Sequence, residues 1–202
     1  MPENPFDQLA DEYDLWFERN RHAYRAELAA LRPSVPQGRG LEVGMGTGRF
    51  ALPLGISTGV DPSLPMLNTA VKKGLEAVRG RAEALPFRDS ALDFVLMVTV
   101  LCFADPLPSL REAFRVVRPG GRLIIGLLDR DSPLGKVYGE KASGSRFYRT
   151  ARFLSVAEAL GMMEAAGWQA TDVRQTVFGG EGPEEVLEGH GQGLFVVIAA
   201  RK

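Results

Sequence analysis

Three alternate glycines stand in the run LEVGMGTGRF, which covers residues 41–50. Gly44, Gly46 and Gly48 follow an apolar stretch typical of a strand, and a helix is expected directly after them. Glycine lets the backbone turn tightly and leaves no Cβ between the chain and a ligand, while free N–H groups at a helix start can face that ligand. Together with the features below, the run indicates a nucleotide-type ligand, whereas a lone Gly-x-Gly would indicate only a turn.

The spacing of these glycines argues against a dinucleotide. A dinucleotide loop has the pattern G-x-G-x-x-G, with the pyrophosphate at the helix N-terminus. Here Arg49 occupies the last position of that pattern, and the run is instead Glu-x-Gly-x-Gly-x-Gly from Glu42. This arrangement suits a ligand without a pyrophosphate. A nicotinamide-dependent oxidoreductase is therefore the weaker alternative.

A carboxylate ends the next expected strand, in the run Gly59-Val60-Asp61. Such a side chain can accept hydrogen bonds from both hydroxyls of a ribose. A structural role is the alternative, because an Asp after a strand is often a helix cap and Pro62-Ser63 follows directly. Both interpretations stay open for Asp61 at the level of the sequence.

The sequence offers no evident catalytic base. His22 falls in an N-terminal helical segment and His190 in a glycine-rich loop, and we expect both to be solvated. Cys102 lies in an apolar run without a basic neighbour, which favours a buried thiol over a nucleophile. A single cysteine and the lack of a His-x-x-x-His pair also predict no metal site. The catalytic residue is left unassigned.

Aromatic residues in two segments could cover the site. Tyr13, Trp16 and Phe17 recur along an amphipathic N-terminal segment and predict a helical lid, although packing onto the domain would explain them equally. The segment 129–152 combines aromatic and basic residues, which suits an acceptor with an aromatic or acidic part, or else a solvated loop. Substrate contacts are predicted for Tyr13, Trp16, Tyr138, Tyr148 and Arg152.

Strands and helices alternate along the chain and must position these residues. Apolar runs predict strands near residues 39–43, 57–61, 76–79, 92–98, 122–128, 169–178 and 193–200. Helical patterns lie near residues 6–31 (one helix or two), 47–53, 63–73, 108–117 and 156–166, the last after a capping box at Ser155. Such alternation predicts a mostly parallel sheet, and the last two strands predict an antiparallel hairpin. Residues 129–152 are expected to be irregular.

Length and composition fit one domain over residues 1–202, with 1–35 as a helical cap and 129–152 as a substrate-side insertion. The formal net charge is −1, and 45% of the residues are hydrophobic. We find neither a basic leader nor an apolar run of membrane-spanning length. We expect a cytoplasmic protein with a small-molecule substrate and no nucleic-acid or membrane partner, and make no prediction of its oligomeric state.

Taken together, these motifs resemble the class I, seven-stranded S-adenosylmethionine (SAM)-dependent methyltransferases, in the small single-domain branch related to ubiquinone and menaquinone methyltransferases. The matching runs are LEVGMGTGRF, GVDPSLPML, RAEALPF, LDFVLMVTVLCFADP and RVVRPGGRLIIG. This resemblance implies a three-layer Rossmann-like α/β sandwich, with a mostly parallel sheet, an antiparallel C-terminal hairpin and an N-terminal helical lid. It also implies SAM as cofactor and S-adenosylhomocysteine (SAH) as product.

The resemblance further implies which residues hold SAM, all near the ends of the first four strands. They are Glu42, Gly44, Met45, Gly46, Gly48, Asp61, Pro62, Ala82, Glu83, Val98 and Thr99. By similarity the glycine run would pass beneath the methionine and ribose, and Glu42 would hold the ammonium group. Asp61 would take the ribose hydroxyls, the backbone at 82–83 would meet the adenine, and residues 98–99 would lie beside the methionine.

Two departures from the family pattern bear on function. Many relatives carry Asp where this chain has Arg81, so recognition of the adenine by Glu83 is open. Relatives often carry Asn and His where Val98 and Cys102 stand, which removes a polar group near the methyl. A non-catalytic SAM-binding regulatory or accessory module is therefore an alternative. Transfer of an activated methyl needs little beyond in-line positioning, which can supply about 7 to 11 kcal/mol. We predict a SAM-dependent methyltransferase with an unidentified acceptor.

Overall fold

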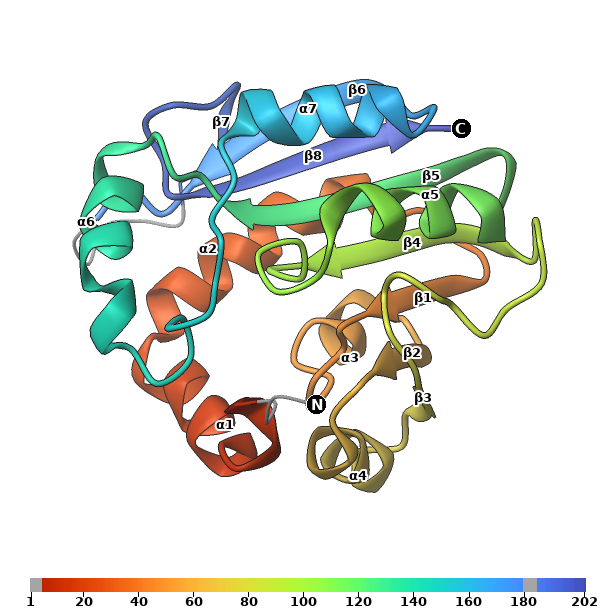
Figure 1. The fold of residues 1–202 in the computed structure, drawn as a ribbon, viewed down its shortest axis with the longest axis horizontal. Helices are drawn as coiled ribbons and strands as arrows, with labels where there is room; N and C mark the ends of the chain where they lie inside the picture. Colours follow the sequence, from red (N-terminus) through yellow and green to blue (C-terminus); the bar gives the residue numbers. More distant parts are fainter. Residues whose placement is uncertain (1–4, 180–184) are drawn as a thin grey trace.

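The computed structural model describes residues 5–179 and 185–202. Its strands form one sheet in the order β3-β2-β1-β4-β5-β8-β6-β7. Helices lie on both faces, so the molecule has the predicted three layers (Figure 1). The strands are β1 (Gly40–Val43), β2 (Thr58–Asp61), β3 (Glu76–Arg79), β4 (Leu92–Val98), β5 (Val117–Leu128), β6 (Gln169–Thr176), β7 (Leu187–Glu188) and β8 (Phe195–Arg201).

The sheet is parallel from β3 to β5 and antiparallel beyond it. Strand β8 inserts between β5 and β6 and runs antiparallel to both, which confirms the predicted C-terminal hairpin. The structure contains one strand that was not predicted. Leu187–Glu188 pairs with Arg174 and Gln175 at the edge of the sheet. This two-residue strand is too short to give an alternating pattern. Part of the connection before it lies outside the described residues.

Helices α1 (Ala10–Arg19), α2 (Arg21–Leu31), α3 (Ala51–Leu54) and α4 (Leu64–Lys72) cover one face of the sheet. The other face is covered by α5 (Pro106–Val116) and α7 (Val156–Ala165). Along β4, Phe94 and Leu96 point into the first layer and Val95 and Met97 into the second. The strand is apolar without interruption because both of its faces are buried.

The prediction that segment 129–152 is irregular was wrong. The segment contains helix α6 (Pro133–Lys141). Ser132 caps this helix by accepting a hydrogen bond from Gly135 N at 3.0 Å, and Pro133 occupies its first turn. Gly135 and Gly139 weaken the helical signal, since glycine is a poor helix former. Gly135 is nevertheless required, because a Cβ there would lie 1.9 Å from the carbonyl oxygen of Asp129.

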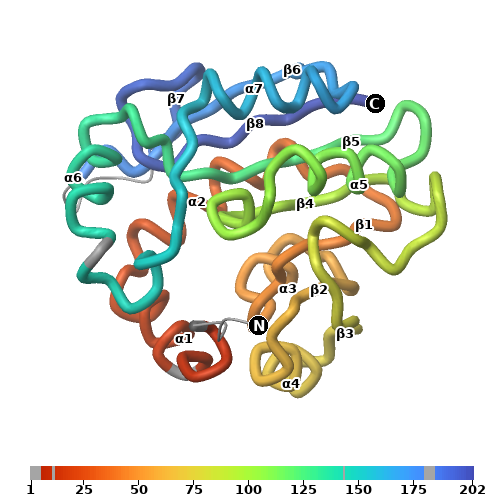
Figure 2. Tube along the Cα trace, in the orientation of Figure 1, coloured from red at the N-terminus to blue at the C-terminus, as the bar shows by residue number. Residues whose placement is uncertain are grey.

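The N-terminal segment is a pair of helices, with α1 and α2 meeting at Asn20. The Asn20 side chain donates to the Trp16 carbonyl at 2.8 Å and so terminates α1. Short 3-10 turns flank these elements at η1 (Pro5–Asp7), η2 (Arg32–Ser34) and η3 (Ala142–Gly144). Figure 2 shows α1 and η1 beside α4, an element much later in the chain. Within residues 5–179 and 185–202, every helix is too short or too polar to cross a bilayer.

Candidate functional site

The glycine loop turns sharply between β1 and α3, with left-handed backbone at its three glycines. A Cβ on Gly44 would lie 2.5 Å from a methyl of Val100, and one on Gly48 would lie 2.2 Å from a methyl of Leu75. Packing within the protein therefore excludes side chains at these two positions. Gly46 differs, because the nearest atoms to its Cβ position belong to the ring of Tyr13, at 3.4 and 3.6 Å.

Glu42 is buried beneath the loop with one unsatisfied oxygen. Its side chain is 1% exposed, and among the described residues its Oε2 is the one buried side-chain nitrogen or oxygen without a hydrogen-bond partner. Burial raises the pKa of Glu42 well above its usual range, against a hydrogen bond from the Ala51 backbone, and the nearby Asp61 adds to the rise. A buried acid with a free acceptor oxygen fits a cationic group of a ligand.

Asp61 ends β2 with its carboxylate turned back to the glycine loop. Its Oδ2 accepts from Gly46 N at 2.9 Å, and its Oδ1 accepts from Ser63 N at 2.8 Å. The N-cap of α4 is Ser63, whose hydroxyl accepts from Met66 N. Asp61 therefore lies against the loop, as a ribose contact requires, and it also shapes the turn before α4. Burial raises the pKa of Asp61.

Two of the other predicted SAM contacts are core side chains. Met45 packs against β2, where a Cβ on Gly59 would lie 2.4 Å from its sulfur, so only the Met45 backbone can face a ligand. Val98 is buried in the same layer. Thr99 follows it with a left-handed φ of 52° and donates its N–H to Gly126 O at 2.8 Å. Pro62 is exposed beyond Asp61.

The loop after β3 holds the predicted adenine contacts. Ala82 is buried, and Glu83 accepts from Asp105 N at 3.0 Å at the start of α5. Arg81, which replaces the acidic residue of many relatives, lies 3.4 Å from Glu83 in an exposed ion pair. The Glu83 carboxylate is thus bonded within the protein, and the role of Glu83 toward adenine stays a prediction.

Helix α1 is bonded to the glycine loop through Asp14. Its carboxylate accepts from the hydroxyl of Thr47, from Arg49 Nε at 2.9 Å and from Lys73 Nζ at 2.9 Å. Thr47 and Arg49 are the residues between and after the glycines. We name this set, Asp14 with Thr47, Arg49 and Lys73, the lid latch.

Arg49 also connects the loop to other residues of the two N-terminal helices. Its guanidinium pairs with Glu18 at 2.9 Å and lies 5.5 Å from the centre of the Phe17 ring, and its carbonyl accepts from the Tyr24 hydroxyl. The residue that breaks the dinucleotide pattern is therefore the one that anchors the lid. Sequence reasoning missed Asp14, because an acidic residue on an amphipathic helix gives no sign of a distant partner.

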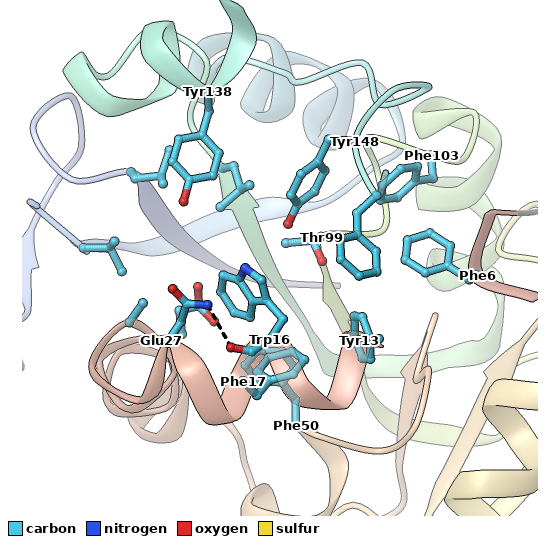
Figure 3. Close-up of a pocket in the computed structure, with 16 residues that line it drawn as sticks. Phe6, Tyr13, Trp16, Phe17, Glu27, Phe50, Thr99, Phe103, Tyr138 and Tyr148 are labelled. Atoms are coloured by element: carbon cyan, nitrogen blue, oxygen red, sulfur yellow. Dashed lines mark hydrogen bonds between the residues drawn. The ribbon is translucent and has the colours of Figure 1, made fainter. Parts of the chain in front are cut away.

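A cavity of about 80 Å³ lies between the N-terminal helices and the segment 129–152. Tyr138 and Tyr148 point their hydroxyls into it from one side, and Tyr13, Trp16 and Glu27 face them from the other (Figure 3). Four predicted substrate residues thus meet here. The fifth, Arg152, is exposed and does not belong to the lining. The lining also contains Phe6, Phe17, Asn20, Ala23, Phe50, Thr99, Phe103, Leu128, Phe147, Val177 and Leu194.

Glu27 in this cavity was not predicted. It is 7% exposed, and burial raises the pKa of Glu27 to about 8. A signal was available, since Ala23, Ala26, Ala30 and Leu31 repeat at helical spacing and place Glu27 on the covered face of α2. The substrate contacts predicted for the N-terminal segment were aromatic residues only, and Glu27 was not considered.

The groups considered for proton transfer lie elsewhere or are inert. His22 and His190 are exposed. Cys102 donates its thiol to Thr99 O at 3.1 Å, and burial raises the pKa of Cys102 to about 12. Burial likewise raises the pKa of Tyr148, which faces the cavity. At neutral pH none of Cys102, Tyr148 or Tyr13, whose pKa is also raised by burial, is ionised.

Comparison with known proteins finds matches to part of this chain and to almost all of it. A family model described as a methyltransferase domain matches residues 41–125. The crystal structure of a "SAM-dependent methyltransferase, possible histamine N-methyltransferase" from Thermotoga maritima has a TM-score of 0.95 and 45% identity, covering 98% of both chains. Uncharacterized protein MJ1123 of Methanocaldococcus jannaschii is 46% identical over 98% of this chain and 99% of its own length. Demethylmenaquinone methyltransferase of Roseiflexus castenholzii is 34% identical over 59% of this chain and 56% of that enzyme.

Proposed function

The chain belongs to the SAM-dependent methyltransferase family, and from this premise we propose that it methylates a small-molecule acceptor held in the aromatic cavity. One observation carries the proposal. Tyr13 lies over Gly46 of the glycine loop and also lines the cavity, so the two binding regions adjoin across one side chain. Thr99, itself a predicted cofactor contact directly after β4, lines the same cavity.

The residues around the loop fit SAM. Glu42 would pair its unsatisfied oxygen with the ammonium group of the methionine part, and Asp61 would accept from the ribose hydroxyls. The Cβ-free surface at Gly46 would lie against the ligand. When bound, SAM supplies a methyl group on a positively charged sulfonium. This chain's part is to hold and orient that group, and Tyr13 offers an aromatic face to the positive charge.

Binding requires the lid to move. A ligand lying against Gly46 on this face must displace the Tyr13 ring, and about 80 Å³ is far below the roughly 300–1,000 Å³ of typical ligand pockets. We infer that α1 opens to admit SAM and acceptor and then closes. Closure by aromatic side chains would exclude water from the transferring methyl.

A small acceptor suits the enclosed lining of the cavity. Because Tyr13, Tyr148 and Cys102 stay protonated at neutral pH, an acceptor atom with an available lone pair is favoured over one that must first lose a proton. The T. maritima relative is described as a possible histamine N-methyltransferase, and histamine is a small molecule, which supports the same size class here.

Two measurements test the function. SAM and SAH, but not NAD, should raise the melting temperature. At a ligand concentration of one hundred times Kd, the free energy of unfolding should rise by about 2.7 kcal/mol. Labelled methyl from SAM should then appear in a fraction of a small-molecule extract incubated with the protein. Stabilisation by NAD instead would contradict the family-based cofactor. Tight SAH binding without label transfer to any fraction would favour the non-catalytic accessory module.

A further inference from the structure

We propose that Glu27 binds a protonated amine of the acceptor, so that the substrates of this enzyme are organic amines. The inference rests on the proposed function, because it names the substrate class for the same aromatic cavity. It concerns recognition: a protonated amine has no lone pair, so the nitrogen held by Glu27 is distinct from the atom that receives the methyl group. The acceptor therefore carries a cationic end and a nucleophilic end.

The first support is the isolation of the Glu27 carboxyl. Glu27 is 7% exposed and lines the cavity from the middle of α2. Among residues 5–179 and 185–202, no side chain forms a hydrogen bond or ion pair with this carboxyl, and its oxygens are not among the fully buried atoms without a partner, so they stay accessible from the cavity. Burial alone accounts for its raised pKa, without a contribution from any cation. Such a carboxyl is destabilising for the fold, since burying an unpaired ionisable group is unfavourable.

The second support is the charge of the surroundings. The titratable groups that Glu27 influences are Tyr13 and Tyr24 on the N-terminal helices, Tyr138 on α6 and Tyr148 after it. All four are neutral phenols near neutral pH, because burial raises the pKa of each. The cavity lining among the described residues contains no Lys, Arg or His, and Arg49 and Arg146, which contact α1, are paired with Asp14 and Glu12. The cavity thus holds a potential negative charge and no internal counterion.

The third support is the aromatic lining. Trp16, Tyr138 and Tyr148 surround the space in front of Glu27 (Figure 3). Aromatic faces attract organic cations, and the attraction is stronger when water is excluded. A carboxylate joined to several rings is a site for an ammonium group. This site argues against the acceptor with an acidic part that the basic residues of segment 129–152 suggested, because the carboxylate of such an acceptor and that of Glu27 would repel each other.

Glu27 and Thr99 lie on opposite sides of Trp16 in Figure 3. Thr99, which is one of the predicted cofactor contacts, directly follows β4, whereas Glu27 belongs to α2. An amine anchored at Glu27 would place the other end of the molecule toward Thr99 and the cofactor. This arrangement separates recognition from methyl transfer.

The test uses amines and their neutral analogues as probes on the SAH-bound protein. Benzylamine, 2-phenylethylamine and tyramine are each paired with the corresponding alcohol, and Kd is measured by calorimetry. We expect each amine to bind at least tenfold more tightly than its alcohol. In Glu27→Gln this preference should fall below about twofold, while alcohol binding is unchanged. The matched control is Glu164→Gln, an exposed acid on α7 that should keep the preference.

A second variant keeps the test decisive if Glu27→Gln folds poorly. Glu27→Met replaces the carboxyl with an apolar side chain of similar size, and it should raise Tm at pH 8 because the buried acid is removed. It should also abolish amine preference while SAH binding persists. The absence of amine preference in all three wild-type pairs, including absence of binding, would overturn the inference. So would retained preference in either Glu27 variant. If the wild-type protein does not bind SAH, that result would instead count against the proposed function.

Discussion

Two buried acids, Glu42 and Glu27, are the residues that the fold itself does not explain. Each lies among apolar or aromatic neighbours and lacks a cationic partner among the described residues. Acids are rarely buried unless they are paired, so an unpaired one indicates a partner that is not part of the chain. SAM carries an ammonium group that suits Glu42, and the proposed amine suits Glu27. The proposed ligands would thus give both acids a partner of opposite charge.

Asp61 carries the first prediction at the residue scale. Asp61→Ala should weaken SAH binding by about 1 to 3 kcal/mol, because charged hydrogen bonds to the ribose are lost. The loop also loses the acceptor for Gly46 N, which adds to the effect. Calorimetric titration with SAH measures it, with Asp131→Ala at an exposed position as the control. Unchanged affinity for SAH would show that Asp61 only shapes the turn before α4.

At the scale of elements, we expect the position of α1 to control access to the proposed site. The lid latch holds it to the glycine loop through one carboxylate, and Tyr13 on the adjacent position covers Gly46. Partial burial raises the pKa of Asp14, but hydrogen bonds from Arg49, Thr47 and Lys73 outweigh this effect and lower the pKa overall. The carboxylate is therefore ionised at neutral pH, and the latch persists over the physiological range.

Breaking the latch should loosen α1 alone. Asp14→Asn removes the negative charge shared by Arg49 and Lys73, at a cost of about 1 kcal/mol because these groups are partly solvated. Amide exchange over Ala10–Arg19 should become about fivefold faster, while exchange in β4 and β5 stays unchanged. Hydrogen exchange by mass spectrometry measures both regions.

The control for this prediction lies on the same helix. Glu12 pairs with Arg146 at the surface, where both side chains are more than two-fifths exposed (46% and 66%). Such exposed pairs contribute little, so Glu12→Gln should leave the exchange of α1 nearly unchanged. Equal effects of the two substitutions, or no effect of Asp14→Asn, would exclude a specific latch.

At the scale of the whole molecule, the two proposed ligand regions both adjoin α1. Tyr13 contacts the glycine loop and also lines the cavity. We therefore expect α1 to close fully only when both ligands are bound. When two ligands stabilise the same closed state, each pays less of the ordering free energy once the other is bound. Their binding free energies must then be coupled reciprocally.

This coupling is the prediction for the whole molecule. The affinity for tyramine should be at least fivefold higher with SAH bound than without it, and tyramine should raise SAH affinity by the same factor. Calorimetry along the four sides of the binding cycle measures both factors. In Asp14→Asn, whose lid is held less firmly, we expect the factor to shrink. Independent binding of the two ligands would show that α1 does not link the regions.

Much of the fold was determined by the sequence alone. Uninterrupted apolar runs predicted β4 and β5 because a strand buried on both faces needs no polar alternation, and the spacing around Ser155 and Glu158 predicted the capping box of α7, which forms. Glu42 and Asp61 lie near the carboxyl ends of β1 and β2, and they meet the glycine run there because parallel strands end at one edge of the sheet. Helix α6 and strand β7 were missed, since glycines or short length remove their periodic signal.

Only the tertiary structure decided what closes the site and which charges it contains. Asp14 meets Arg49 and Lys73 across long stretches of chain, and no periodicity of a single helix reports such a contact. Glu27 is unusual because of the rings that surround it from α1, α6 and the segment after α6, and not because of its neighbours in sequence. Local patterns fix which face of an element is buried, whereas the free energy of a buried charge depends on everything packed against it.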